Sequence, residues 1–144
     1  MLKYILFQFN NFVENLPETP PAYFYFEGKK KDNGRSWCIY CQLAEPVIKA
    51  YLAELNKEIT FATVDVGDMP YCCMITDMIT LISYFHEIFS ISSWKDKSCP
   101  FRTDPRTKLM VIPTIIKWKG VKRLEGSQCN KRELLEMMFH DDDE

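Results

Sequence analysis

Two short apolar runs of strand length stand out in the hydrophobic pattern of the chain. Residues 22–26 read Ala-Tyr-Phe-Tyr-Phe, and residues 59–66 read Ile-Thr-Phe-Ala-Thr-Val-Asp-Val. Runs of this length, rich in aromatic and β-branched residues, predict strands that are buried in a sheet. Between them, residues 38–57 carry apolar side chains at helical spacing around Pro46, which predicts a long helix with a kink. The pattern therefore indicates a strand–helix–strand unit with a right-handed crossover.

Each end of the chain adds a helix to this unit. Residues 4–9 are aromatic and β-branched and predict a first strand, followed by a short helix that Asn10 or Asn11 caps and that runs to Leu16. Asn130 is predicted to cap a final helix. The apolar face of that helix consists of Leu134, Leu135, Met138 and Phe139.

The part of the chain before the final helix predicts a connector and a hairpin. Residues 94–108 form a polar connector that leads into a helix, in which Phe101 and Leu109 are expected to pack. Residues 112–118 and 121–125 are strand-like runs separated by Lys-Gly, and this arrangement predicts an antiparallel hairpin.

An apolar segment at about 72–93 departs from this alternation of strands and helices. It approaches the length of a membrane span, but Asp77, His86 and Glu87 lie within it, and charged side chains are costly inside a bilayer. We therefore interpret the segment as an insertion and expect no membrane association. An insertion proper and an in-frame unspliced intron both fit its composition.

Composition narrows the class of protein. The 144 residues, of which 47% are hydrophobic and 26% charged, fit one domain over residues 1–144 with an acidic tail at 141–144. A net charge of −2 gives no reason to expect nucleic-acid binding. The N-terminus lacks a secretory signal, which predicts a cytosolic protein, and we expect a monomer.

The candidate chemistry lies in residues 36–46, Ser-Trp-Cys-Ile-Tyr-Cys-Gln-Leu-Ala-Glu-Pro. Two cysteines separated by two residues can close a small disulfide ring when the first begins a helix. Only that first cysteine lies where unpaired backbone N–H groups and the helix dipole stabilise a thiolate. We therefore predict that Cys38 attacks a disulfide and that Cys41 resolves the mixed disulfide.

The other cysteines do not have the spacing of a metal site. A structural zinc site needs four ligands, commonly as two spaced pairs, whereas Cys72 and Cys73 are adjacent and Cys99 and Cys129 stand alone. We expect no metal and interpret these four as ordinary thiols. A chance pairing of Cys38 and Cys41 is the alternative to a working dithiol.

Three features together resemble the thioredoxin fold, an α/β fold with a central mixed sheet flanked by helices. Trp37 directly precedes the cysteine pair, Pro46 follows Cys41 by five residues, and Ile112-Pro113-Thr114 is similar to the cis-proline loop of that fold. The resemblance implies that a cis bond at Ile112–Pro113 turns a backbone edge toward the dithiol, where an extended substrate can pair. The residues expected to bind substrate are Trp37, Ile39, Tyr40, Ile112 and Pro113.

The chain also resembles the thioredoxin domain-containing protein 17 family, apart from the segment at 72–93. The stretches that carry this resemblance are residues 23–28, 36–38, 44–47, 66–71 and 125–139, together with the long loop at 28–36. The resemblance implies a cytosolic disulfide reductase without a bound cofactor, whose redox-active disulfide receives electrons from NADPH through thioredoxin reductase. Its substrates would be disulfides of proteins and small molecules.

Two departures from these families affect the expected chemistry. The family has Pro and Asp between its cysteines, whereas this chain has Ile39 and Tyr40. The strand at 22–26 also lacks the buried aspartate that thioredoxin places below its dithiol, which leaves Glu45 and Asp65 as candidate proton acceptors.

Two other functions remain open from the sequence. Tyr40 before the second cysteine is similar to glutaredoxins, which implies a glutathione-linked enzyme, although nothing after Thr114 resembles their glutathione-binding pattern. The altered dithiol is also compatible with a redox-inactive thioredoxin-fold module that binds partners through the loop and the Pro113 edge.

Overall fold

The computed structural model describes residues 2–4, 6–67, 94, 97 and 99–140. The predicted insertion at 72–93, the acidic tail at 141–144, Cys72 and Cys73 lie outside these residues. Of the helices in the described part of the chain, none is both long enough and apolar enough to cross a membrane.

The centre of the fold is a five-stranded mixed sheet in the order β1-β3-β2-β4-β5. Strands β1 and β2 both pair parallel with β3, whereas β4 pairs antiparallel with β2 and β5 pairs antiparallel with β4. The strands are β1 (Leu2–Tyr4), β2 (Ala22–Glu27), β3 (Thr60–Asp65), β4 (Thr114–Lys117) and β5 (Arg123–Glu125). The predicted strands β2 and β3 and the predicted hairpin are confirmed.

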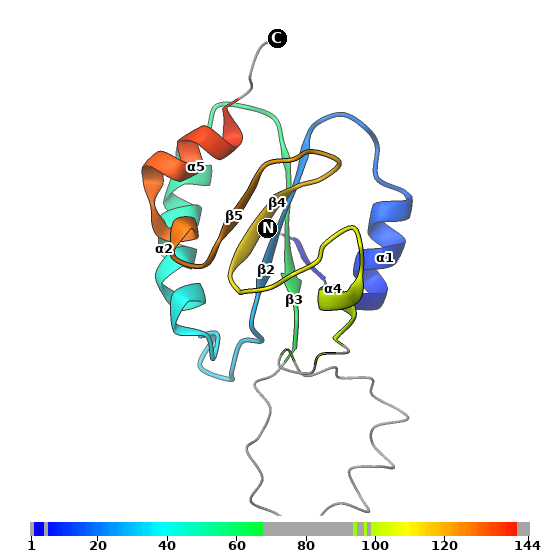
Figure 1. Ribbon diagram of the computed structural model, residues 1–144. Coiled ribbons are helices and arrows are strands. Elements are labelled where there is room, and N and C mark those ends of the chain that lie inside the picture. The colour runs from blue at the N-terminus through cyan, green and yellow to red at the C-terminus, as the bar shows by residue number, and fades with distance from the viewer. Residues whose placement is uncertain (1, 5, 68–93, 95–96, 98, 141–144) are drawn as a thin grey trace, which may run out of the picture.

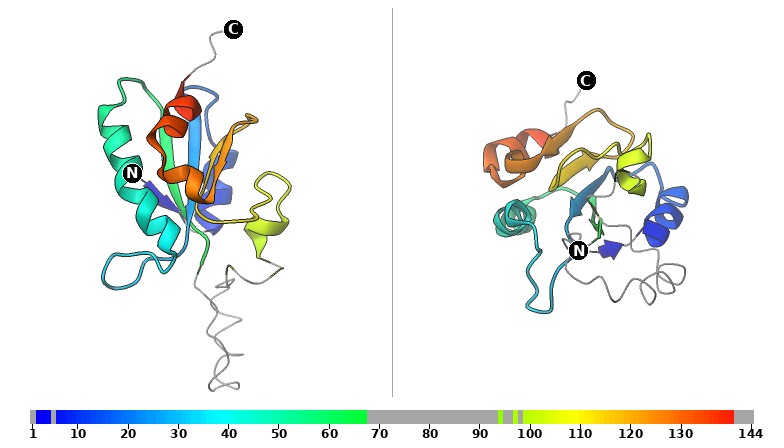
Figure 2. Two further views of the ribbon diagram at one scale, coloured as in Figure 1. Left: turned by 60° about the vertical axis from the view of Figure 1, so that its left-hand side comes forward. Right: turned by 60° about the horizontal axis from the view of Figure 1, so that its bottom comes forward.

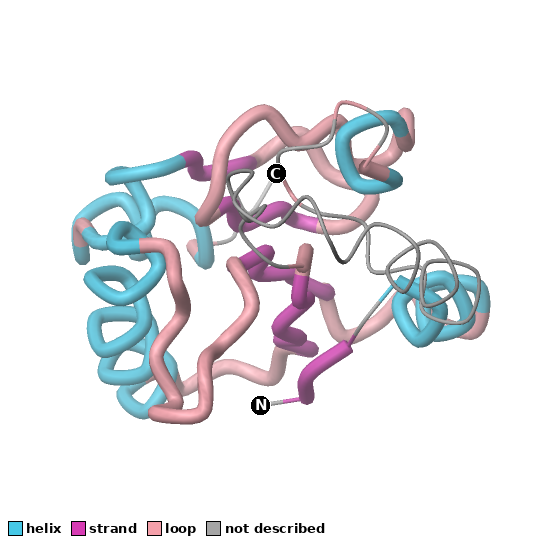
Figure 3. Tube along the Cα trace, turned by 90° about the horizontal axis from the view of Figure 1, so that it is seen from below, coloured by secondary structure: helices cyan, strands magenta, loops and turns pink. Residues whose placement is uncertain are grey.

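Helices cover both faces of the sheet and make three layers (Figures 1 and 3). Helices α2 (Ile39–Glu54) and α5 (Arg132–Phe139) lie on one face, and α1 (Leu6–Glu14) and the short α4 (Pro100–Thr103) lie on the other. A 3-10 turn, η1 (Gly126–Asn130), connects β5 to α5. The two turned views show the same separation of the helix pairs (Figure 2). The predicted mixed sheet flanked by helices is confirmed.

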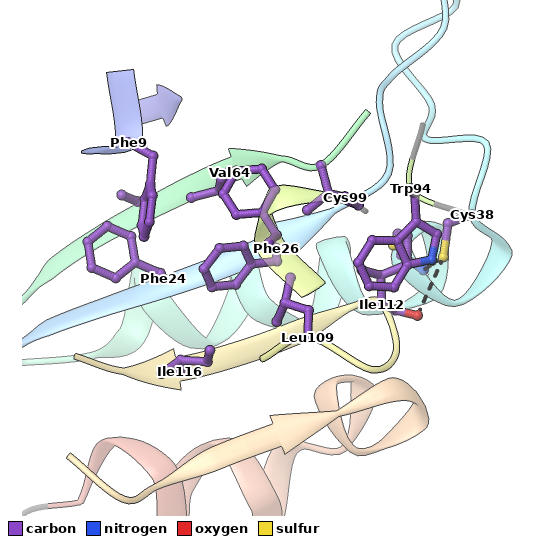
Figure 4. Packing of buried hydrophobic residues seen from close by; sticks show 14 of the residues in the cluster. Phe9, Phe24, Phe26, Cys38, Val64, Trp94, Cys99, Leu109, Ile112 and Ile116 are labelled. Carbon is purple, nitrogen blue, oxygen red and sulfur yellow. Dashed lines mark hydrogen bonds between the residues drawn. The ribbon is translucent and has the colours of Figure 1, made fainter. Parts of the chain in front are cut away.

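Strand β2 supplies side chains to both hydrophobic cores, and all six of its residues are buried. Because successive side chains of a strand point to opposite faces, Tyr23 and Tyr25 pack in the core that includes residues of α2 and α5. Phe24 and Phe26 pack in the core that includes Phe9 of α1, as Figure 4 shows. This double burial explains why residues 22–26 read as a continuous apolar run.

The prediction for the N-terminus was wrong in its boundary. Strand β1 ends at Tyr4, and the residues from Leu6 belong to α1, so Asn10 and Asn11 lie inside the helix and do not cap it. The physical reason is that Phe9 and Val13, four residues apart, are both buried in the same core, which is the spacing of one helix face. Packing of this face overrides the local β propensity.

The cap of the last helix also differs from the prediction. Residue Asn130 ends the 3-10 turn, and Lys131 occupies the N-cap position of α5 without a side-chain cap hydrogen bond. The predicted apolar face is present, because Leu135, Met138 and Phe139 are buried and Leu134 packs against the same core. Phe101 and Leu109 are buried, as expected, but the helix α4 (Pro100–Thr103) lies within the predicted connector, and Leu109 follows it outside any helix.

Phe9 is the central aromatic side chain of the core on the α1 face. Its ring lies edge-on to the rings of Phe24, Phe26, Phe101 and Trp118, with centroid distances of 5.2, 5.8, 5.7 and 5.7 Å. We expect Phe9→Ala to lower the free energy of unfolding by about 3–5 kcal/mol, measured by urea denaturation, because it leaves a cavity among these rings. Met137→Ala is the control, since Met137 is exposed, and should change stability by less than about 0.5 kcal/mol. A similar small loss for Phe9→Ala would contradict this account of the core.

Candidate functional site

The loop from β2 to the dithiol is fastened to the carboxyl end of the sheet. The backbone N–H of Lys29 donates to the carbonyl of Gly67 at 3.1 Å, and the backbone N–H of Trp37 donates to the carbonyl of Lys29 at 3.3 Å. The indole Nε1–H of Trp37 donates to Gly67 at 2.9 Å. The indole ring lies directly against Gly28, where an added Cβ would be 2.7 Å from the ring carbon Cε2. Trp37 is thereby fixed beside the cysteine pair.

Ser36 connects this loop to the start of α2. Its hydroxyl donates to the carbonyl of Gly28 at 2.7 Å and accepts from the backbone N–H of Cys38 at 3.2 Å. The side-chain amide of Gln42 donates to the carbonyl of Ser36 at 2.7 Å. The roles of Ser36 and Gln42 were not predicted from the sequence. The available signal was that both are polar residues close to the cysteines.

The two cysteines lie at the helix start in the predicted arrangement. Cys38 is the N-cap of α2, and its sulfur accepts a hydrogen bond from the backbone N–H of Cys41 at 3.3 Å. Both are free thiols, and Cys38 retains 7% of its surface exposed whereas Cys41 retains none. An incoming group can therefore reach Cys38 first.

The loop that contains Ile112 and Pro113, here called the proline loop, lies against Cys38. The Ile112–Pro113 bond is cis, and the Cys38 thiol donates to the carbonyl oxygen of Ile112 at 3.8 Å, drawn as the dashed line in Figure 4. The same view shows the Trp94 ring beside Ile112 and Cys38, and Trp94 is buried in this core. The structure therefore brings Trp37, Cys38 and the Ile112–Pro113 edge together.

The surroundings of the two thiols shift their pKa values in opposite directions. The pKa of Cys38 is lowered to about 7, first by a hydrogen bond from the Cys41 side chain and further by the backbone N–H groups of Cys41 and Tyr40, against burial and the charge of Glu27. The pKa of Cys41 is raised, first by its hydrogen bond to Cys38 and then by burial. Near neutral pH the thiolate therefore belongs to Cys38.

Ile39 and Tyr40 form the exposed first turn of α2. Their side chains are 69% and 55% exposed. Sequence reasoning missed three further exposed apolar side chains on the segments that carry the dithiol and the proline loop, namely Leu43, Met110 and Val111. The substrate-binding role expected of Ile39 and Tyr40 stays a prediction.

The proton acceptors expected from the sequence are engaged in other contacts. Glu45 pairs with Lys30 at 2.5 Å and with Lys49 at 2.7 Å, and Asp65 accepts a hydrogen bond from the backbone N–H of Gly67 at 2.9 Å. Sequence reasoning missed Glu27, the last residue of β2, which is only 1% exposed. Its position at the end of a fully apolar run was the signal that could have identified it.

The remaining cysteines of the described part lie in the two hydrophobic cores. Cys99 and Cys129 are both fully buried and free. The Cys129 thiol donates to the carbonyl oxygens of Leu124 and Pro113 at 3.4 and 3.6 Å, and burial raises its pKa to about 12. Within residues 2–4, 6–67, 94, 97 and 99–140, no three His, Cys, Asp or Glu side chains gather as a candidate metal site.

Comparison with known proteins places this site in a family. A family described as thioredoxin domain-containing protein 17-like, thioredoxin domain, matches residues 6–141. The chain belongs to this family. It is 32% identical to thioredoxin domain-containing protein 17 of Mus musculus over 87% of this chain and 82% of the mouse protein. It is 32% identical to the Danio rerio protein of that name over 82% of this chain and 76% of that protein, and 32% identical to the Arabidopsis thaliana thioredoxin-like protein Clot over 71% and 62%.

Membership in this family agrees with the geometry of the chain. The match confirms the thioredoxin-like fold and the predicted resemblance to the thioredoxin domain-containing protein 17 family. The Cys38-x-x-Cys41 pair of this family member lies at the helix start with the proline loop against it.

The lowered pKa of Cys38 predicts how the reactivity of this thiol changes with pH. Because the pKa of Cys38 is lowered to about 7, its thiolate persists down to that pH and is lost as the pH falls through it. We expect iodoacetamide alkylation of Cys38, followed by mass spectrometry of the tryptic peptide, to rise with a midpoint near pH 7. Cys41→Ala removes the main stabilising hydrogen bond and should move the midpoint upward. Buried Cys129 is the internal control and should stay unmodified; equal midpoints in both proteins would contradict this assignment.

Proposed function

We propose that this protein is a thiol–disulfide oxidoreductase that reduces disulfides of proteins and small molecules. The observation that supports the proposal best is the unequal acidity of two adjacent thiols, with the pKa of Cys38 lowered and that of Cys41 raised. A disulfide reductase needs one nucleophilic thiolate and one protonated thiol held in reserve. The slight exposure of Cys38 and the full burial of Cys41 fit the same division of roles.

In the proposed reaction the Cys38 thiolate attacks one sulfur of a substrate disulfide. A bond forms between Cys38 and that sulfur, the substrate disulfide breaks, and the other substrate sulfur leaves as a thiolate. Cys41 then loses its proton and attacks Cys38, which releases the second substrate thiolate and leaves the Cys38–Cys41 disulfide. Two electrons have then passed from the dithiol to the substrate.

The substrate is proposed to bind over the exposed turn and the proline loop. The proposed binding residues are Trp37, Ile39 and Tyr40, which are neighbours of Cys38 along the chain, and Ile112 and Pro113. An extended substrate segment can pair with a backbone edge, and the Ile112 carbonyl lies within 3.8 Å of the Cys38 sulfur.

The proposal also covers the source of the electrons, the cellular compartment and the oligomeric state. The oxidised dithiol is reduced by thioredoxin reductase at the expense of NADPH, and no other cofactor takes part. The protein works as a monomer in the cytosol, without nucleic acid or membrane partners. The low net charge of −2 supports the absence of a nucleic-acid partner.

An insulin-reduction assay with the cysteine variants tests the function and the two roles together. With NADPH and thioredoxin reductase, the wild-type protein should turn over insulin disulfides, whereas Cys38→Ser should be inactive because it lacks the nucleophile. Cys41→Ser should accumulate a mixed disulfide with substrate, visible on a non-reducing gel. Met137→Ser is the control, since Met137 is an exposed residue of α5, which carries none of the proposed site residues.

The result of the insulin assay distinguishes the proposed reductase from a glutaredoxin-like enzyme and from a redox-inactive binding module. Turnover with glutathione and glutathione reductase alone would favour a glutaredoxin-like enzyme. No turnover with either system would favour a redox-inactive binding module. Equal trapping by the two serine variants would show that the assigned roles of the cysteines are wrong.

Tyr40 offers a test of how the helix start sets the reactivity of Cys38. Its backbone N–H stabilises the Cys38 thiolate, and its side chain is exposed. Tyr40→Asp restores the family's carboxylate at this position. The added negative charge should raise the pKa of Cys38, by less than about one unit because solvent screens it, and should speed resolution by Cys41.

Thiolate absorbance and single-turnover kinetics measure these two effects. Tyr40→Asn is the matched control, because it has the size of aspartate without the charge, and it should leave the pKa of Cys38 nearer to that of the wild type. A fall in that pKa for Tyr40→Asp, or slower resolution, would show that this charge does not govern the site.

A further inference from the structure

Ser36 places a buried polar side chain directly before the dithiol. The residue is only 2% exposed. Its hydroxyl donates to the carbonyl oxygen of Gly28 at 2.7 Å and accepts from the backbone N–H of Cys38 at 3.2 Å. The side-chain amide of Gln42 donates to the backbone carbonyl of Ser36 at 2.7 Å. The reaction proposed above gives no part to Ser36.

The start of α2 has half of a capping box. In such a box the N-cap side chain accepts from the backbone N–H of the third helical residue, and the side chain of that residue accepts from the N-cap N–H. Here Cys38 is the N-cap, and its sulfur accepts from the backbone N–H of Cys41, the third residue of the helix. The two reactive cysteines therefore make the first half of the box themselves.

Ser36 supplies the second half of the box. The Cys41 side chain cannot serve as the acceptor for the Cys38 N–H, because its thiol is hydrogen-bonded to the Cys38 sulfur and attacks that sulfur in the proposed reaction. The Ser36 hydroxyl accepts from this N–H instead. A buried N–H without an acceptor costs free energy. The hydroxyl therefore holds the Cys38 backbone in its N-cap conformation and leaves the Cys41 sulfur available.

The same hydroxyl joins the helix start to the end of β2. Its donation to the Gly28 carbonyl holds the residue whose own backbone N–H bonds to the Cys41 thiol. Gln42, in the second turn of α2, holds the Ser36 carbonyl from the helix. One side chain thus connects the backbone of Cys38 with the residue that contacts Cys41.

We propose that Ser36 is a positioning residue for the dithiol, which completes the cap of α2 in place of the Cys41 side chain and so aligns the two cysteines before their disulfide forms. The inference rests on the proposed reductase function. Closing the disulfide ring fixes the Cys38 backbone, and little conformational freedom is lost where Ser36 has fixed it already. Without the hydroxyl, the reduced protein has more freedom to lose, and closing the ring is less favourable.

The effective concentration of Cys41 at Cys38 measures this alignment. In a glutathione buffer, the mixed disulfide of Cys38 with glutathione exchanges with the Cys38–Cys41 disulfide. The bond between the two cysteines forms, the bond to glutathione breaks, and the electron pair of the broken bond and the Cys41 proton end on the glutathione thiol. The equilibrium constant is the concentration of free glutathione at which the two forms are equal. The preceding attack of Cys38 on glutathione disulfide does not enter this constant.

Mass spectrometry of the acid-quenched, full-length protein distinguishes the two forms. After alkylation of the free thiols, the tryptic peptide 36–49 contains both cysteines, and its mass differs between the mixed and the internal disulfide. Ser36→Ala should lower the effective concentration about 10-fold, the order of the loss when a buried hydrogen bond is removed. Ser127→Ala is the matched control, because it makes the same change at an exposed position of η1, and it should leave the constant unchanged.

Gln42→Met provides a second test of the same network. It removes the amide that holds the Ser36 carbonyl but keeps a side chain of similar length. It should lower the effective concentration by a smaller factor, about 3-fold, so the proposal can be tested even where Ser36→Ala does not fold. Urea denaturation is measured in parallel, because a merely structural role of Ser36 predicts lower stability with an unchanged constant in the folded protein.

An effective concentration that is unchanged or raised in folded Ser36→Ala would overturn the inference. The assay uses neither insulin nor a reductase. A failure of the proposed function, seen as no insulin turnover by the wild type, is therefore distinct from a failure of the role assigned to Ser36.

Discussion

The burial of β2 on both faces is the constraint on which the rest of the structure depends. The strand lies in the middle of the sheet, and its alternating Tyr and Phe side chains fill two separate cores. Helices must therefore cover each face, and the carboxyl end of the strand must emerge between them. That end is Glu27 and Gly28, where Ser36 and the Trp37 ring make their contacts. The position of the dithiol is thus a result of how the core is packed.

The chemistry of the site follows from the direction of a helix. Its first N–H groups have no partner within the helix, and here those of Tyr40 and Cys41 stabilise the Cys38 sulfur. Cys41, one turn further on, is fully buried, and its pKa is raised first by its hydrogen bond to Cys38 and then by burial. The same short segment therefore lowers the pKa of Cys38 and raises the pKa of Cys41.

Some sequence signals were sufficient to predict an element of the fold, and others were not. The strands at 22–27 and 60–65, the hairpin, and the helix that begins at the cysteines could be predicted, because each combines a clear period with a recognisable turn or cap. The boundary near Leu6 could not, because the choice between strand and helix depended on the packing of Phe9 against rings distant in sequence. The burial of Glu27 was missed for a similar reason, since it depends on α2 and the Lys30 loop folding over the end of β2.

The contact between Gly28 and Trp37 also bears on how this protein can change by mutation. Any side chain at position 28 would have its first carbon within 2.7 to 3.0 Å of three atoms of the indole ring, closer than non-bonded carbon atoms approach. A larger residue there is acceptable only if a smaller ring replaces Trp37 at the same time. The order of substitution therefore matters: a side chain at position 28 becomes possible only after Trp37 has been replaced by a smaller residue or together with that change.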